Sequence, residues 1–152
     1  CKYKVTGADQ VAFAGVKNAK PSKADIPKAV NIGGKSFKVT SIAANALKKS
    51  KVKSITVGDN VKEIGNSAFE GCSKLTKVTL GKGVTKIGSN TFKGCKKLGT
   101  ITVKSTKLTK VGKNALKGIK SNARIKVPAK KYKAYGKLFK GKGQGKKVKI
   151  VK

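Results

Sequence analysis

Residues that could carry acid–base, nucleophilic or metal chemistry are few in this chain of 152 residues. There is no histidine, so neither a histidine-activated nucleophile nor a histidine-containing zinc cluster can be assembled. Asp59 and Glu63 are close in sequence and could be close in space, as a pair of catalytic carboxylates must be. In a chain with 38 lysine and arginine residues, we interpret them as surface counter-charges instead. The complete set of carboxylates is Asp9, Asp25, Asp59, Glu63 and Glu70.

Two Gly-Lys-Gly sequences, at 81–83 and 141–143, look like fragments of phosphate-binding loops. Neither has the GxxxxGK(S/T) spacing that lets backbone N–H groups surround a phosphate. We therefore predict that the protein is not an enzyme, and we expect no catalytic residue, no cofactor and no metal site.

A repeat of 23 residues organises the middle of the chain, where extended triplets recur at 55–57, 78–80 and 101–103. Each triplet is followed by Val or Leu, then an Ile-Gly-like, an Ala-Phe-like and a Gly-Cys-like pair. A fixed period of about 20–29 residues indicates a solenoid, whose units stack rather than fold alone. Each unit is predicted to hold a long strand, a short extended piece and one or two helical turns, over 66–72 in the first unit. The residues predicted to point inward are Ile55, Val57, Val61, Ile64, Ala68, Phe69, Cys72 and Leu75, and then Val78, Leu80, Val84, Ile87, Thr91, Phe92, Cys95 and Leu98.

The cysteines fit this packing pattern. Cys72 and Cys95 occupy equivalent repeat positions, with Ile119 in the next unit, and Cys1 is the third cysteine. Neighbouring strands are about 4.8 Å apart, which is within disulfide reach. Parallel side chains make poor disulfide geometry, however, and thiols pack well as small apolar groups. We predict reduced, buried thiols at Cys72 and Cys95.

Both ends of the array are predicted to be capped, as a solenoid requires for solubility. The N-terminal part is predicted to form a strand near 3–5 with a hairpin partner at 11–16, followed by the first strand of the stack at 24–26. The C-terminal part reads as an amphipathic helix over 129–140 and a lysine-studded strand over 147–151. The predicted organisation is one structural domain made of an N-terminal cap at 1–38, the solenoid at 39–127 and a C-terminal cap at 128–152.

The repeated unit resembles the BspA-type leucine-rich repeat of bacteria. The residues that carry the resemblance are Val61, Ile64, Gly65, Ala68, Phe69, Cys72 and Leu75, and then Val84, Ile87, Gly88, Phe92, Cys95 and Leu98. The lysine-rich tail from 126 to 150 is similar to the end piece of such repeats in secreted proteins of Gram-positive anaerobes. The resemblance implies leucine-rich-repeat-like coils of mixed α/β type, in a secreted or surface protein that uses them for adhesion or protein–protein contact. The family defines no catalytic residues.

Two functions remain open. The first is a binding or adhesion module whose contact face is the outward side of the long strands, although threonine also simply suits an exposed strand. The candidate residues on this face are Ser54, Thr56, Lys77, Thr79, Thr100, Thr102, Arg124 and Lys126. The second is a structural or wall-retention segment, whose lysines hold anionic polymers while the active part of the protein lies elsewhere. We interpret Cys1, in the absence of an initiator Met, as the start of a mature or excised fragment.

The net charge of +33 attracts polyanions, and the alternative that the lysines are only a solvated coat stays open. Arg124 is the only arginine and there is no tryptophan, which disfavours nucleic acid because its readers use arginine forks and aromatic stacking. The resemblance implies a host or bacterial surface protein as the partner, and the charge adds an anionic wall polymer as the alternative. No run of 18 apolar residues occurs, so no transmembrane segment is expected. The resemblance implies an extracellular or cell-surface location.

Overall fold

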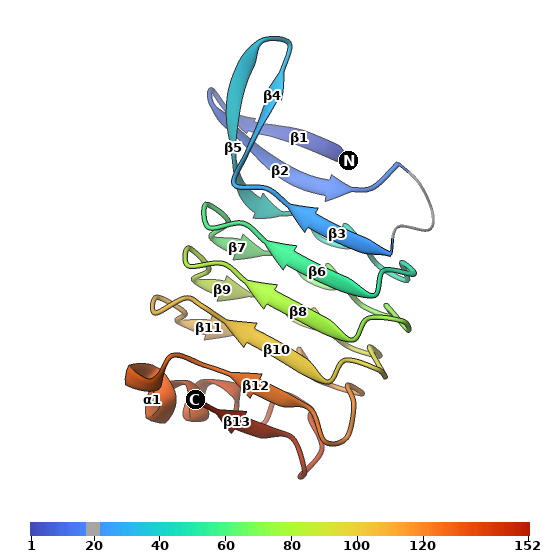
Figure 1. Cartoon of the computed structure of the whole chain (residues 1–152), viewed down its shortest axis with the longest axis vertical. Coiled ribbons are helices and arrows are strands. Elements are labelled where there is room, and N and C mark those ends of the chain that lie inside the picture. Colours follow the sequence, from blue (N-terminus) through green and yellow to red (C-terminus); the bar gives the residue numbers. More distant parts are fainter. Residues whose placement is uncertain (18–21) are drawn as a thin grey trace.

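The computed structural model describes residues 1–17 and 22–152. Residues 18–21, which fall inside the expected N-terminal cap, lie outside the described residues. The described chain winds through coils that stack from two N-terminal hairpins to a C-terminal helix (Figure 1). The predicted fold class is confirmed: a repeat solenoid with parallel strands, β structure at its start and a helix plus strand at its end.

Two sheets follow the stack. The long strands are β3 (Lys23–Ile26), β6 (Ser54–Val57), β8 (Lys77–Leu80), β10 (Thr100–Val103), β12 (Arg124–Lys126) and β13 (Lys149–Val151). They form a parallel sheet in the order β13-β12-β10-β8-β6-β3. We call it the long-strand sheet because in the three repeat units it holds the four-residue strands β6, β8 and β10, whereas β7, β9 and β11 have two residues each. The strands of the other sheet are β1 (Lys2–Gly7), β2 (Gln10–Gly15), β4 (Ala29–Ile32), β5 (Lys35–Ile42), β7 (Glu63–Ile64), β9 (Lys86–Ile87) and β11 (Lys110–Val111). Their order is β1-β2-β5-β7-β9-β11, and β4 pairs antiparallel with β5.

The 23-residue period of the sequence sets which residues lie opposite each other in neighbouring strands. Ile55 lies opposite Val78, and Val78 lies opposite Ile101, so each side chain packs on its equivalent in the next coil. All sixteen residues predicted to point inward are at most 2% exposed, which confirms the predicted inward set. Thr91, the polar member of that set, satisfies its hydroxyl by donating to the Gly88 carbonyl at 2.6 Å. The core is therefore one continuous stripe through the stack.

The predicted helical turns over 66–72 are wrong. This segment is a series of turns in which Ser67 has φ 56°, and its equivalents Asn90 and Asn114 both have φ 57°. A left-handed residue at that point stops a right-handed helix. Alternate backbone N–H groups donate to the next coil, as Phe69 N does to Thr91 O at 3.1 Å, and the others close short turns within the segment, as Glu70 N does to Ser67 O at 3.1 Å. Neighbouring coils thus supply half of the partners that a helix would have found within itself.

Close contact between coils explains the repeated Ile-Gly pair. A Cβ atom added at Gly88 would lie 2.7 Å from the backbone nitrogen of Asn66 in the preceding coil, which is closer than real Cβ contacts allow. Gly65 approaches the preceding coil in the same way. The glycines are required by packing at these positions, because any side chain would push two coils apart.

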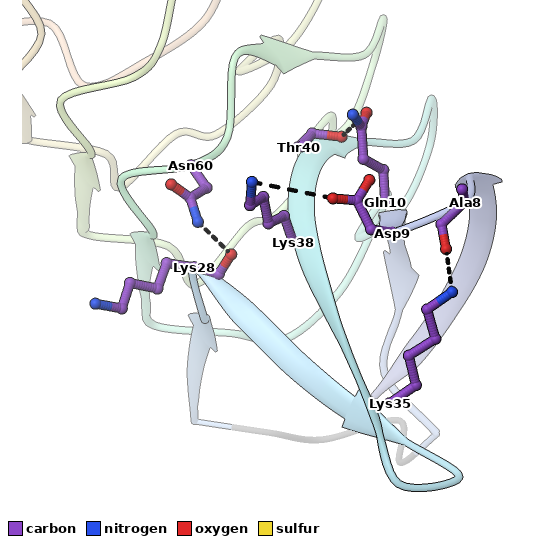
Figure 2. Close-up of polar contacts among 8 residues, drawn as sticks. All are labelled: Ala8, Asp9, Gln10, Lys28, Lys35, Lys38, Thr40 and Asn60. Carbon is purple, nitrogen blue, oxygen red and sulfur yellow. Dashed lines mark hydrogen bonds and ion pairs between the residues drawn. The ribbon is translucent and has the colours of Figure 1, made fainter.

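The N-terminal end is closed by two hairpins that contact each other and the first coil (Figure 2). Lys35 Nζ donates to the Ala8 carbonyl at 2.6 Å and joins the tips of the two hairpins. Asn60 Nδ2 donates to the Lys28 carbonyl at 3.0 Å and joins the second hairpin to the first coil. Gly33 and Gly34 have φ 57° and 81°, as the turn between β4 and β5 requires.

The C-terminal end is closed by a short 3-10 helix, η1 (Ala129–Lys131), the helix α1 (Tyr132–Phe139) and the parallel strand β13. Tyr135 and Phe139 are buried in the core. The Tyr135 hydroxyl donates to Ser105 O at 2.9 Å and accepts a bond from Leu108 N at 3.0 Å. In the described part of the chain, no helix combines the length and the apolar character that crossing a bilayer demands.

Candidate binding surface

The eight residues proposed from the sequence lie on one face of the long-strand sheet. Along each strand they alternate with core residues, because successive side chains point to opposite faces of a sheet. Strand register arranges them in two columns across β6, β8, β10 and β12. The first column is Ser54, Lys77, Thr100 and Arg124, and the second is Thr56, Thr79, Thr102 and Lys126.

Cations and hydroxyls on this face differ in exposure. Lys77, Arg124 and Lys126 are exposed, whereas Thr79 and Thr102 are half-buried. Threonines elsewhere in the repeat use their hydroxyls internally: Thr76, Thr85 and Thr109 donate to carbonyls of the preceding coil at 3.0–3.1 Å. Within the described residues, the hydroxyls of the second column form no such bond.

The face is electrostatically uneven along the stack. On β3, at its N-terminal end, Lys23 Nζ lies 3.1 Å from Asp25 Oδ2 and the two charges offset each other. On β12 and β13, at the other end, Arg124, Lys126 and Lys149 carry positive charge with no acidic residue on either strand. A negatively charged partner is therefore attracted most strongly to the C-terminal half of the face.

Sequence reasoning missed a groove on the opposite side of the molecule. It has a volume of about 550 Å³ and follows the end of β5 and the short strands β7, β9 and β11. Ser41, Glu63, Lys86 and Lys110 occupy one register column there, and Lys86 Nζ is paired with Glu63 Oε1 at 3.0 Å. The signal in the sequence was the repeated Ile-Gly pair, whose glycines Gly65, Gly88 and Gly112 line the groove.

Glu63 is a surface counter-charge, as predicted, whereas Asp59 forms no ion pair among the described residues. Among the described residues, four of the five form ion pairs with lysine, and the fifth, Asp59, accepts a hydrogen bond from Lys82 N at 2.8 Å. The pKa of Glu70 is lowered, first by a hydrogen bond from the Ser67 hydroxyl and also by Lys48, whose Nζ lies 3.2 Å away. A carboxylate held ionised in this way is not a proton donor at neutral pH.

The thiols of Cys72 and Cys95 are fully buried and not joined to each other. Cys72 Sγ donates to Leu47 O at 3.0 Å, and Cys95 Sγ donates to Phe69 O at 3.1 Å. The pKa of Cys95 is raised by its hydrogen bond to Cys72 and then by burial. Both cysteines therefore act as packing groups, as predicted, and offer no nucleophile to solvent. Within residues 1–17 and 22–152, no cluster of three or more Cys, Asp or Glu side chains is placed to hold a metal ion.

Comparison with known proteins adds a family match. The family model described as "BspA type Leucine rich repeat region (6 copies)" matches residues 40–152. None of the curated proteins compared with the chain matches it.

Solved structures with the same architecture include a leucine-rich repeat protein from Bacteroides ovatus, 28% identical with a TM-score of 0.73. That similarity covers 99% of this chain and 35% of the other, so this chain spans about a third of that protein's length. A leucine-rich repeat protein from Bacteroides capillosus is 26% identical with a TM-score of 0.67, covering 78% of this chain and 91% of that one. A leucine-rich cell surface protein from Faecalibacterium prausnitzii shares the fold at 18% identity and a TM-score of 0.61, covering 98% and 48%.

Proposed function

Because the chain belongs to the family of BspA-type leucine-rich repeat regions, we propose that it is a non-catalytic binding module of a bacterial cell-surface or secreted protein. The contact surface in this proposal is the outward face of the long-strand sheet. Solenoids suit such a role because stacking equivalent units produces an extended surface from short repeats.

The register of the two surface columns carries this proposal. Thr56, Thr79 and Thr102 repeat at the strand spacing of about 4.8 Å, so a partner meets the same group at regular intervals. The backbone that carries them is fixed by hydrogen bonds on both sides. Little conformational entropy is lost when a partner binds a surface already ordered in this way.

The absence of catalysis is part of the proposal and rests on the residues available. The sequence has no histidine. The five carboxylates are engaged by lysines or by a backbone N–H group, and the thiols of Cys72 and Cys95 are buried. General acid–base catalysis needs a titratable group within reach of a substrate and with a pKa near the working pH. The described residues support no such constellation.

Location at the cell surface or outside the cell is proposed from the family and from charge. A net charge of +33 attracts anionic surfaces and keeps the protein soluble. The proposed partner is a host or bacterial surface protein, or an anionic wall polymer. If the partner is an anionic wall polymer, the domain retains a longer protein at the wall. The excess of cations favours this alternative, because the four ion pairs of the described residues use only four of the 38 lysines and arginines.

The test of the contact face measures binding of the fluorescently labelled protein to intact Gram-positive cells and to cultured epithelial cells. The double variant Thr79→Glu, Thr102→Glu should bind about tenfold more weakly or worse, because two carboxylates enter the middle of the face. Its matched control, Thr6→Glu with Ser36→Glu, changes the net charge equally at exposed positions of the N-terminal hairpins. Equal losses in the two variants would show that the sheet face is not the contact surface.

The wall-retention alternative is separated by its ligand and its salt dependence. Purified cell walls stripped of anionic polymers should lose binding if the lysines alone retain the protein. That binding should also fall steeply as salt is raised, because exposed charges are screened over about 8 Å at physiological ionic strength. Binding to stripped walls that withstands salt would instead support a specific partner on the sheet face.

A further inference from the structure

Lysine and arginine side chains gather along one edge of the solenoid. The sequence repeat alone did not point to this edge. Four connections, at 50–54, 72–77, 95–100 and 119–124, lead into the starts of β6, β8, β10 and β12. We call them the strand-start edge. Each connection carries two lysine or arginine residues and none carries an acidic residue. All eight cationic side chains are exposed, and none takes part in an ion pair formed by the described residues.

The stack brings these connections side by side. Thr76 N donates to Lys53 O at 2.8 Å, Gly99 N donates to Thr76 O at 3.0 Å, and Arg124 N donates to Gly99 O at 2.9 Å. Consecutive coils are about 4.8 Å apart, so the four connections span roughly 14 Å along the stacking axis. Cations as far apart in sequence as Lys51 and Arg124 (124 − 51 = 73 residues) thus lie along one edge. Neighbouring coils are closer than a Debye length of about 8 Å, so their fields add at physiological salt.

The edge at the other ends of the strands is different. The connections 58–62, 81–85 and 104–109 carry four lysines and Asp59. Their polar groups serve the fold: Asp59 Oδ1 accepts from Lys82 N at 2.8 Å, and Ser105 Oγ donates to Val84 O at 2.6 Å. Helix α1 also closes over this edge through Tyr135. The strand-start edge therefore carries twice as many cations as the opposite edge and, unlike it, no acidic residue.

We propose that the strand-start edge is a binding site for a linear polyanion that lies along the stacking axis. The inference rests on the proposed binding role and names the ligand chemistry and the place where it binds. Eight charges over roughly 14 Å amount to about one cation every 2 Å, which is enough to match a chain with one anionic group every 3–4 Å.

The residue types define the chemistry of the ligand. Lysine is a compact point charge on a flexible stem, so it neutralises anions without the planar, bidentate selection that arginine provides. None of the four connections contains an aromatic side chain, so nucleic-acid bases find no stacking platform on this edge. The ligand is therefore recognised by its charge spacing and its length.

The test uses inorganic polyphosphate of about 20 units as the probe and two matched variants, each with four Lys→Gln changes. One variant changes Lys51, Lys74, Lys97 and Lys120, one residue in each connection of the strand-start edge. The control changes Lys62, Lys82, Lys104 and Lys107 at the opposite edge. All eight side chains are exposed and both variants lose the same charge. A third variant with Lys→Arg at the first four positions keeps the charge, and thermal melting checks that all of them fold.

The strand-start variant should bind polyphosphate at least about tenfold more weakly, and the slope of log K against log salt should become shallower by about 3. The control should change by less than about threefold, and the Lys→Arg variant should bind like the wild type. The wild type should also bind tripolyphosphate far more weakly than the long chain, because three phosphates are shorter than the edge. This length dependence is independent of any variant.

Equal losses in the two Lys→Gln variants would overturn the proposed site and leave only diffuse attraction. Preference by about tenfold or more for single-stranded DNA over polyphosphate of equal charge would overturn the ligand class, since it would indicate base contacts. Failure of the wild-type protein to bind polyphosphate at low salt would contradict the proposed polyanion site. The proposed binding role of the sheet face would still be tested separately, by the Thr79→Glu, Thr102→Glu variant.

Discussion

Phe69 and Phe92 lie one above the other in consecutive coils, with ring centroids 5.6 Å apart and ring planes inclined by 30°. Neither ring has any exposed surface. They occupy the same repeat position, so the contact follows from the stacking of two equivalent units. A pair of this kind links the repeat in the sequence to the stability of the fold.

Replacing Phe92 with alanine should lower the free energy of unfolding by about 3–5 kcal/mol, because it opens a cavity in the middle of the core stripe. Urea unfolding followed by circular dichroism measures the change. Val5→Ala, at a side chain that is 62% exposed, is the control and should change stability by less than about 0.5 kcal/mol. A loss below about 1 kcal/mol for Phe92→Ala would mean that the site relaxes in a way the packing does not predict.

Replacing Gly88 with alanine should destabilise the protein by about 1–3 kcal/mol, because the new Cβ meets the backbone of the preceding coil. The matched control is Gly136→Ala in α1, where an added Cβ has nothing within 4 Å. That change should be neutral or stabilise by up to about 1 kcal/mol, since alanine is the better helix former. Thermal melts of the two variants should therefore shift in different directions, and a shared shift would contradict the close-approach explanation.

Cys72 and Cys95 should resist a thiol-specific reagent in the native protein, whereas the exposed Cys1 should react quickly. Because both buried thiols lack solvent-accessible surface, their labelling should stay slow when the pH is increased from about 7 to about 9, and the raised pKa of Cys95 further disfavours its thiolate. Mass spectrometry after labelling, with and without urea, measures all three sites. Detection of a Cys72–Cys95 disulfide in the native protein would contradict the packing role.

Glu70 should contribute pH-dependent stability. Its pKa is lowered in the folded protein, so the contribution is present above the unfolded pKa of about 4.3 and is lost as the pH falls through the folded value. Glu70→Gln should therefore melt at a lower temperature than the wild type at pH 7, and the difference should shrink at pH 3. Lys23→Gln, which breaks an exposed ion pair elsewhere, is the control and should have little effect at either pH. A difference that stays constant with pH would show that the Glu70 carboxylate does not act through its ionisation.

Much of the fold could be predicted from the sequence, because the repeat imposes the same burial on equivalent positions. Ile55, Val78 and Ile101 recur at a fixed interval, and a stack buries all three only if their coils are in register. The same reasoning placed Thr56, Thr79 and Thr102 on the outward face, since side chains alternate along a strand. Whether this face binds a partner stays a prediction.

Other features were decided by the tertiary structure. The turns around Ser67 resemble a helix start in the sequence, but the N–H of Phe69 finds its acceptor on Thr91 in the next coil, which local sequence cannot reveal. The strand-start edge likewise depends on the stack, because cations as far apart in the chain as Lys51 and Arg124 lie on one edge only when the coils are stacked. Local sequence determines which residues are buried or exposed within a coil. The hydrogen bonds between coils determine which exposed residues share a surface.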